Sequence, residues 1–221
     1  EVTVSGDGFA KGEGAAYTVT GSQKIAGSST NYFTYTLKEG TKADNYNITK
    51  NEGTLTVTNR TAKYEITVEA NSGSEKYDGT EKSVSGLKTT EFTVEGEKYT
   101  VSGLTAGATG TDAGEYTANV TGTAVVKDAD NNDVTSQFAV TAKAGKLTIT
   151  KRDVTLTSGS AEKEFDGDPL TNDEVTVSGD GFAEGEGATY NVTGSQKIEG
   201  FSKDHFTYTL NEGTEAENYV I

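Results

Sequence analysis

Residues 1–48 read EVTVSGDGFAKGEGAAYTVTGSQKIAGSSTNYFTYTLKEGTKADNYNI, and residues 174–221 read EVTVSGDGFAEGEGATYNVTGSQKIEGFSKDHFTYTLNEGTEAENYVI. The two stretches align without a gap at an offset of 173 residues and differ at 12 of 48 positions. We call residues 1–48 the first copy and residues 174–221 the second copy. A repeat at a fixed long period predicts that the chain is assembled from units rather than built around one core.

A fainter echo inside the period predicts two kinds of unit. The sequence GTLTV at residues 53–57 recurs as GKLTI at residues 145–149, which lie 92 residues later. From these matches we predict three repeats: residues 1–58, an incomplete repeat of type A that lacks its N-terminal strand; residues 59–150, a complete repeat of type B; and residues 151–221, an incomplete repeat of type A that lacks its C-terminal strand. We expect the chain to be a fragment of a longer array.

Strand signals dominate the whole chain. Apolar residues alternate with threonine in VTV at residues 2–4 and 175–177, FTYTL at 33–37, LTI at 147–149 and VTL at 154–156. This period of two is typical of half-buried antiparallel strands. The predicted fold class is therefore all-β, an elongated tandem array of small antiparallel β domains with two alternating repeat types. The sequence leaves a β-sandwich and a β-grasp-like sheet open.

Three aromatic features suggest where side chains pack. Tyr77 and Phe165 each precede an Asp-Gly pair, and we expect both rings to fill a core beneath that turn. Tyr116 follows the sequence DAGE and predicts a strand entry resembling a tyrosine corner. Other tyrosines, such as Tyr17 and Tyr35, keep the phase of neighbouring apolar residues, which also predicts burial. Residues 133–138 predict a short helical turn.

Composition excludes several classes of function. Val, Ile, Leu and Phe supply only 40 of 221 residues, which argues against one large core. The chain has no Cys, one His and a net charge of −15, so we expect no disulfide or thiol chemistry, no nucleic-acid binding and no attachment to anionic membranes. No apolar run is long enough to span a bilayer, so we also expect no membrane insertion.

The order of three motifs resembles a known family. The YDGT turn at residues 77–80, DAGEYT at 112–117 and the closing GKLTI strand at 145–149 resemble MBG-type repeats, which form tandem arrays in bacterial cell-surface adhesin-like proteins. The resemblance implies a secreted, extracellular protein of the bacterial cell surface or cell wall, whose anchor lies outside this fragment. It implies no catalysis and no cofactor, and a role as stalk.

No sequence motif predicts catalysis. His205 is the single histidine, and Tyr32 occupies the equivalent position of the first copy. A catalytic histidine that is missing from the sister repeat is implausible, so we expect a structural or surface role for His205. The chain also lacks the common hydrolase, metalloprotease and phosphate-binding motifs, so we predict no catalytic and no cofactor-binding residues.

Calcium is the only metal for which the sequence offers a candidate. Asp128, Asp130 and Asn132 place oxygen ligands at alternate positions, as calcium loops do. The EF-hand pattern then fails, because Asp133 stands where glycine is wanted and Ala139 where a bidentate glutamate would stand. An acidic hairpin explains the run equally well, so the calcium candidate is weak.

Two further expectations concern partners. The first alternative to a stalk is a module that binds a host ligand, such as a mucin, glycan or matrix protein, through repeated weak sites. The copies differ in surface charge, for example Lys11 against Glu184 and Lys42 against Glu215, which favours a spacer. The second expectation is head-to-tail self-association, because the incomplete end repeats leave strand edges open.

Overall fold

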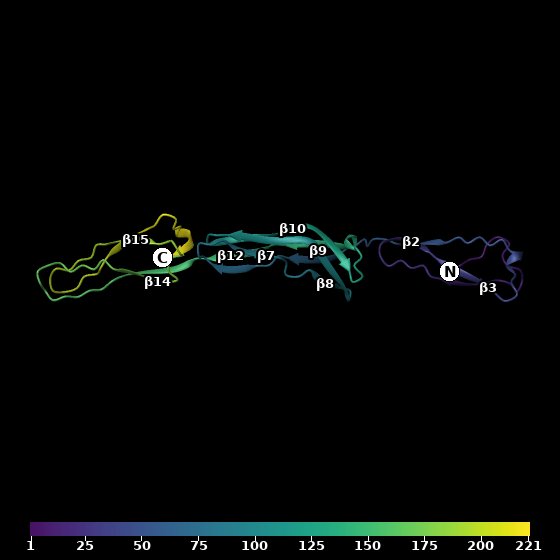
Figure 1. Cartoon of the computed structure of the whole chain (residues 1–221), viewed down its shortest axis with the longest axis horizontal. Helices are drawn as coiled ribbons and strands as arrows, with labels where there is room; N and C mark the ends of the chain where they lie inside the picture. The colour runs from purple at the N-terminus through teal and green to yellow at the C-terminus, as the bar shows by residue number, and fades with distance from the viewer. The chain divides into compact units, whose positions relative to one another are not determined.

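The computed structural model describes all residues, Glu1–Ile221, and almost every regular element is a β-strand (Figure 1). The predicted all-β fold is therefore confirmed. The strands are β1 (Ala15–Val19), β2 (Gly27–Asn31), β3 (Phe33–Leu37), β4 (Gly53–Val57), β5 (Tyr64–Glu69), β6 (Gly73–Lys76), β7 (Lys82–Ser85), β8 (Glu91–Val94), β9 (Glu97–Gly110), β10 (Gly114–Asp128), β11 (Phe138–Lys143), β12 (Gly145–Thr150), β13 (Arg152–Ser158), β14 (Val175–Gly179), β15 (Ala188–Val192), β16 (Phe206–Leu210) and β17 (Tyr219–Val220).

The helical segments are three short 3₁₀ turns, η1 (Ala43–Asn45), η2 (Thr135–Gln137) and η3 (Ala216–Asn218). The turn η2 confirms the short helical turn predicted within residues 133–138. Each of the three turns is far shorter and more polar than a segment that crosses a lipid bilayer, and the structure has no helix that could do so.

The largest sheet has six strands in the order β6-β12-β10-β9-β7, and β8 pairs with β9 outside that path. The pair β6–β12 is parallel, whereas β10–β12, β7–β9 and β8–β9 are antiparallel. Small sheets make up the remainder: β1-β3, β2-β4, β5-β11, β14-β13-β17 and β15-β16. In β3, β4, β12 and β13 apolar residues alternate with threonine, which gives each of these strands one face to bury.

The chain divides into two compact units. The first comprises residues 1–66, 91–102 and 124–140, and the second comprises residues 67–90, 103–123 and 141–221. In the first unit, the Phe138 ring lies 4.8 Å from that of Tyr99 and 5.6 Å from that of Tyr64, and Val101 and Val126 are buried. In the second unit, Leu147, Val68 and Ala70 are fully buried. The predicted repeat boundaries near residues 58 and 150 stay a prediction.

The first and second copies form the same pair of antiparallel strands. In the first copy β1 pairs with β3 from Ala15↔Leu37 to Val19↔Phe33, and in the second copy β15 pairs with β16 from Ala188↔Leu210 to Val192↔Phe206. These registers are identical at the offset of 173 residues. The turns η1 and η3 are also equivalent. The 12 differences between the copies therefore leave this part of the fold unchanged.

The predicted strand at residues 2–4 is wrong, although the equivalent residues form β14 in the second copy. There β14 pairs with β13, and β13 also pairs with β17. The first copy has no counterpart of β13 in the structure, so residues 2–4 and 46–47 have no ladder partner and form no strand. The converse holds for β2, which pairs with β4, whereas residues 200–204 of the second copy have no such partner and form no strand.

The aromatic predictions are confirmed in part. Tyr77 is buried, and the Tyr116 hydroxyl donates a hydrogen bond of 2.9 Å to the Asp112 carbonyl oxygen, as a tyrosine corner requires. Phe165 is 74% exposed, so its predicted burial is wrong. It lies in the loop between β13 and β14, which no further strand covers. Tyr17 and Tyr35 face each other across β1 and β3 and also remain exposed, because this two-stranded sheet has too little facing surface to bury them.

Candidate functional site

The most highly organised site in the chain joins the middle segment, which we define as residues 59–150, to the residues that follow it. Strand β12 ends at Thr150 and β13 begins at Arg152, so one residue separates them. The parallel pair β6–β12 brings Lys76 opposite Thr150, and the Tyr77 amide donates to the Thr150 carbonyl oxygen at 2.9 Å. We call this junction the joint. Its side chains are Lys76, Tyr77, Asp112, Arg152, Asp180, Phe182, Ala183, Glu186, Asn218 and Tyr219.

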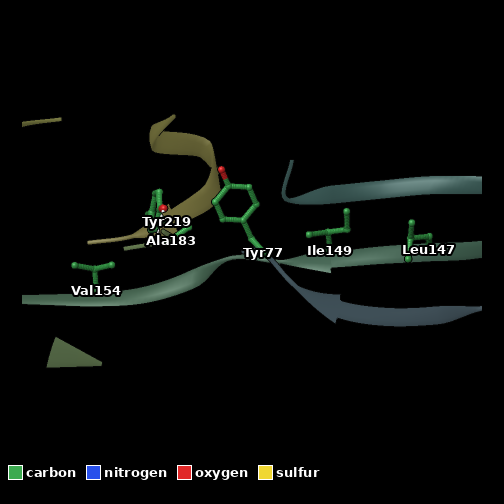
Figure 2. Close-up of a cluster of buried hydrophobic side chains, with 6 residues drawn as sticks. All are labelled: Tyr77, Leu147, Ile149, Val154, Ala183 and Tyr219. Carbon is green, nitrogen blue, oxygen red and sulfur yellow. Dashed lines mark hydrogen bonds between the residues drawn. The ribbon is translucent and has the colours of Figure 1, made fainter. Parts of the chain in front are cut away.

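An aromatic cluster forms the centre of the joint. Figure 2 shows the Tyr77 ring between Ile149 on one side and Tyr219 and Ala183 on the other. The rings of Tyr77 and Tyr219 stand edge to face, with centroids 5.7 Å apart, and the Phe182 ring lies 5.1 Å from that of Tyr219. Tyr77 and Tyr219 are each only 4% exposed. Edge-to-face pairs of this kind add directional attraction to the hydrophobic effect.

The carboxylate of Glu186 ties the two tyrosines together. Tyr77 donates its hydroxyl to Oε1 of Glu186, and Tyr219 donates its hydroxyl to Oε2 at 2.8 Å. The Ala183 amide in turn donates to the Tyr219 hydroxyl at 3.0 Å. Burial, followed by the hydrogen bond to Glu186, raises the pKa of Tyr77 far above its ordinary value, and burial also raises the pKa of Tyr219. Both hydroxyls are therefore protonated donors at neutral pH.

A buried amide makes the second connection. Asn218 ends the turn η3 and is fully buried. Its Oδ1 accepts a hydrogen bond of 2.6 Å from the Ala113 amide, and its Nδ2 donates to Oδ1 of Asp112 at 3.0 Å. Both partners belong to the middle segment, immediately before β10. A buried asparagine that satisfies donor and acceptor in this way fixes the position of two segments, because any displacement leaves polar groups unpaired.

Charged groups make the third connection at the rim. The Lys76 ammonium donates to both carboxylate oxygens of Asp180 at 2.7 Å, and this contact lowers the pKa of Asp180. The Arg152 guanidinium donates to three carbonyl oxygens, those of Gly181 at 2.8 Å, Tyr77 at 3.3 Å and Asp180. The joint thus combines an apolar centre with polar connections on several sides, an arrangement that holds two segments in one orientation.

Sequence reasoning did not single out Glu186, Asn218 or Tyr219 as site residues. One signal was present in the sequence. The counterparts of the joint residues in the first copy, namely Asp7, Phe9, Ala10, Glu13, Asn45 and Tyr46, are all identical, and none of the 12 differences falls on them. That signal alone says nothing of the partner, because Asp112 and Lys76 lie about a hundred residues earlier and meet the second copy only in the folded structure.

The calcium candidate lies elsewhere, in the turn after β10. Oδ1 of Asp128 accepts hydrogen bonds from the amides of Asp130 and Asn132 at 3.0 Å and 2.9 Å. Asp130 pairs instead with Lys24 at 2.7 Å. The three predicted ligands lie in one turn whose hydrogen bonds already account for its shape. Nowhere in the chain do three or more His, Cys, Asp or Glu side chains gather as they would around a metal ion. Calcium binding at this turn stays a prediction.

An open groove lies between the loop of residues 158–172 and the loop of residues 194–204 in the second copy. Three exposed apolar side chains belong to it: Phe165, Ile198 and Phe201. Both carboxylate oxygens of Asp204 are buried there without a hydrogen-bond partner. The equivalent Asn31 of the first copy likewise has a buried, unpaired Oδ1, so the unpaired oxygen is a feature of both copies.

His205 is exposed and immediately precedes β16, where its carbonyl oxygen accepts the Thr193 amide at 2.8 Å. The expected structural or surface role of His205 stays a prediction. Comparison of the chain with protein-family models, with curated proteins and with solved structures gives no match. The resemblance to MBG-type repeats therefore remains an expectation.

Proposed function

We propose that this chain is a non-catalytic spacer, part of the stalk of an adhesin-like protein on the bacterial cell surface. In this proposal it is built from tandem repeats of two alternating types, with residues 59–150 as the complete repeat of type B and residues 1–58 and 151–221 as incomplete repeats of type A. The observation that carries the proposal is the joint. A spacer holds its two ends at a fixed separation only if its units cannot bend freely against each other.

The joint resists bending for three physical reasons. A single residue, Lys151, separates β12 from β13, so there is no flexible linker. Rotation about it would expose the buried rings of Tyr77 and Tyr219 to water. It would also leave the Asn218 amide and the Ala113 amide unpaired, and each such group costs about 1–3 kcal/mol when buried without a partner.

Surface charge supports the same function. The net charge of −15 over 221 residues makes neighbouring stalks repel each other and discourages pairing between exposed strand edges. The resemblance to MBG-type repeats supports an extracellular location and the absence of a cofactor. In the proposal, repetition adds length, and adhesion belongs to other parts of the parent protein.

A distance measurement between two spin labels tests the stiffness of the joint. The chain has no cysteine, so Asn119→Cys in β10 and Thr209→Cys in β16 give two unique, exposed labelling sites. We expect one narrow distance distribution. The control is the same labelled chain with Glu186→Ala and Asn218→Ala, in which we expect a broad distribution. A broad distribution in the chain with an intact joint would contradict the spacer.

The groove between residues 158–172 and residues 194–204 favours one alternative function, a module that binds a host mucin, glycan or matrix protein. Phe201 is 94% exposed, and the first copy has Ser28 at the equivalent position. Exposed aromatic rings are common in glycan sites. The test is a screen of the full chain against these ligands at several salt concentrations. Saturable, salt-resistant binding that Phe201→Ser abolishes would establish the alternative, whereas the spacer predicts no binding.

A further inference from the structure

The first copy already holds the surface that forms the joint in the second copy. The Ala10 amide donates to the Tyr46 hydroxyl at 3.1 Å, and Tyr46 donates that hydroxyl to Oε2 of Glu13. The rings of Phe9 and Tyr46 stand 5.0 Å apart, edge to face. In the second copy the equivalent amide bond, that of Ala183, is 3.0 Å and the equivalent ring separation is 5.1 Å. The surface is thus formed before any partner covers it.

This surface of the first copy is uncovered. Asn45 and Ala10 are exposed and Tyr46 is only half-buried, whereas their counterparts Asn218, Ala183 and Tyr219 are all buried. Oε1 of Glu13 has no protein partner, while the same atom of Glu186 accepts the Tyr77 hydroxyl. We call this set the vacant surface. It consists of Asp7, Phe9, Ala10, Glu13, Asn45 and Tyr46.

We propose that the vacant surface is a docking site for a repeat of the type of residues 59–150, bound through the edge that carries Lys76, Tyr77 and the Asp112-Ala113 pair. The proposal rests on the spacer function and adds a partner to it. Each connection has its counterpart. A tyrosine hydroxyl would reach Oε1 of Glu13, an aspartate and an amide would pair with Asn45, and a lysine would pair with Asp7.

We choose a repeat of this type as the occupant because such a repeat already covers the equivalent surface of the second copy in this chain. All six residues of the vacant surface are identical in the second copy, where the edge of the middle segment covers them. The middle segment of this chain cannot bind the vacant surface through the same edge, because Asn218, Tyr219 and Glu186 already cover that edge. The docking site therefore requires another repeat of the same type.

The experiment lengthens the full chain by adding a duplicate of residues 59–173 directly before Glu1. Residue 1 is equivalent to residue 174, so this addition restores both the edge and the counterpart of β13 in register. The readout is amide hydrogen exchange of the peptide covering residues 43–48. It differs in mass from residues 216–221, since one reads ADNYNI and the other AENYVI.

We expect exchange at residues 43–48 to slow at least tenfold and to match residues 216–221. The matched control carries alanine for the added tyrosine that corresponds to Tyr77, and we expect it to restore fast exchange. Peptides from the added and original middle segments have equal masses, so a single slow population shows that both are folded. Unchanged exchange at residues 43–48 would overturn the docking proposal. The spin-label distances do not involve the first copy, so they report on the spacer independently.

Discussion

The two copies of one 48-residue sequence have different environments in the same chain. In the second copy Tyr219 and Asn218 are buried, and residues 219–220 form β17 against β13. In the first copy Tyr46 is half-buried and Asn45 is exposed. Residues 46–47, which correspond to residues 219–220, form no strand. Because 36 of 48 residues are identical, including all six joint residues that lie in the second copy, the difference comes from the neighbouring segments. Burial here is a property of the joint rather than of the 48-residue sequence alone.

The largest effect is expected from removing the central ring of the joint. Tyr219→Ala deletes contacts with Tyr77 and Phe182 and two hydrogen bonds, and should lower the free energy of unfolding of the second copy by about 3–5 kcal/mol. The matched change in the first copy, Tyr46→Ala, should cost about 1 kcal/mol, because that ring is half exposed. Denaturant titration followed by hydrogen exchange measures both, and equal losses would refute the comparison.

The buried amide gives the next largest difference. Asn218→Ala leaves the Ala113 amide and Asp112 unpaired, and should destabilise the second copy by about 1–3 kcal/mol. Asn45→Ala removes an exposed side chain and should change stability by less than about 0.5 kcal/mol. Thermal unfolding of the two variants and the parent chain makes the measurement. A loss for Asn45→Ala as large as that for Asn218→Ala would show that the asparagine side chain stabilises its own copy rather than the joint.

A third experiment supplies the second copy with the strand that the first copy has. Adding the sequence of residues 49–58 after Ile221 gives residues 200–204 a partner equivalent to β4. Burial of the side chains equivalent to Leu55 and Val57 opposes the cost of ordering the strand, so we expect a net gain of about 1 kcal/mol. The peptide covering residues 198–204 should gain exchange protection. Serine at those two apolar positions is the control, and protection that survives it would rule out strand pairing.

The smallest effect is expected at the charged rim. Lys76→Ala removes the partner of Asp180 and should weaken the joint slightly at low salt, with no difference at high salt. Lys76 lowers the folded-state pKa of Asp180, so its stabilisation is present above the ordinary aspartate pKa of about 3.9 and is lost as the pH falls through the lower value. The unfolding midpoints of the parent chain and of Lys76→Ala should therefore converge in acid. A difference in unfolding midpoint that persists at low pH would show that Lys76 acts through packing instead.

Several parts of the fold were accessible from the sequence. Alternation of apolar residues with threonine predicted β3, β12, β13 and β14, because period two determines which face of a strand is buried. The same rule failed at residues 2–4, since a strand also needs a partner and local pattern does not provide one. The Asp-Gly rule likewise succeeded at Tyr77 and failed at Phe165, although the two motifs read alike. Only Tyr77 has a second segment of the chain, carrying Tyr219 and Ala183, to pack against.

The joint itself was beyond sequence reasoning for a related reason. Glu186, Asn218 and Tyr219 contact residues more than a hundred positions away, and nothing in the local pattern marks such pairs. The polar residues also looked ordinary, because glutamate and asparagine are common in this acidic chain. What made them distinctive was burial, which depends on the tertiary arrangement of β6, β12, β13 and η3.

The most direct test of the account is amide hydrogen exchange of the unmodified chain, comparing residues 43–48 with residues 216–221. The two peptides have the same 3₁₀ turn and differ at two of six positions, so the exchange of each is compared with its own intrinsic rate. We expect residues 216–221 to exchange at least tenfold more slowly, because β17 and Asn218 are held in the joint. Equal exchange in the two peptides would show that the joint does not hold in solution and would contradict the account.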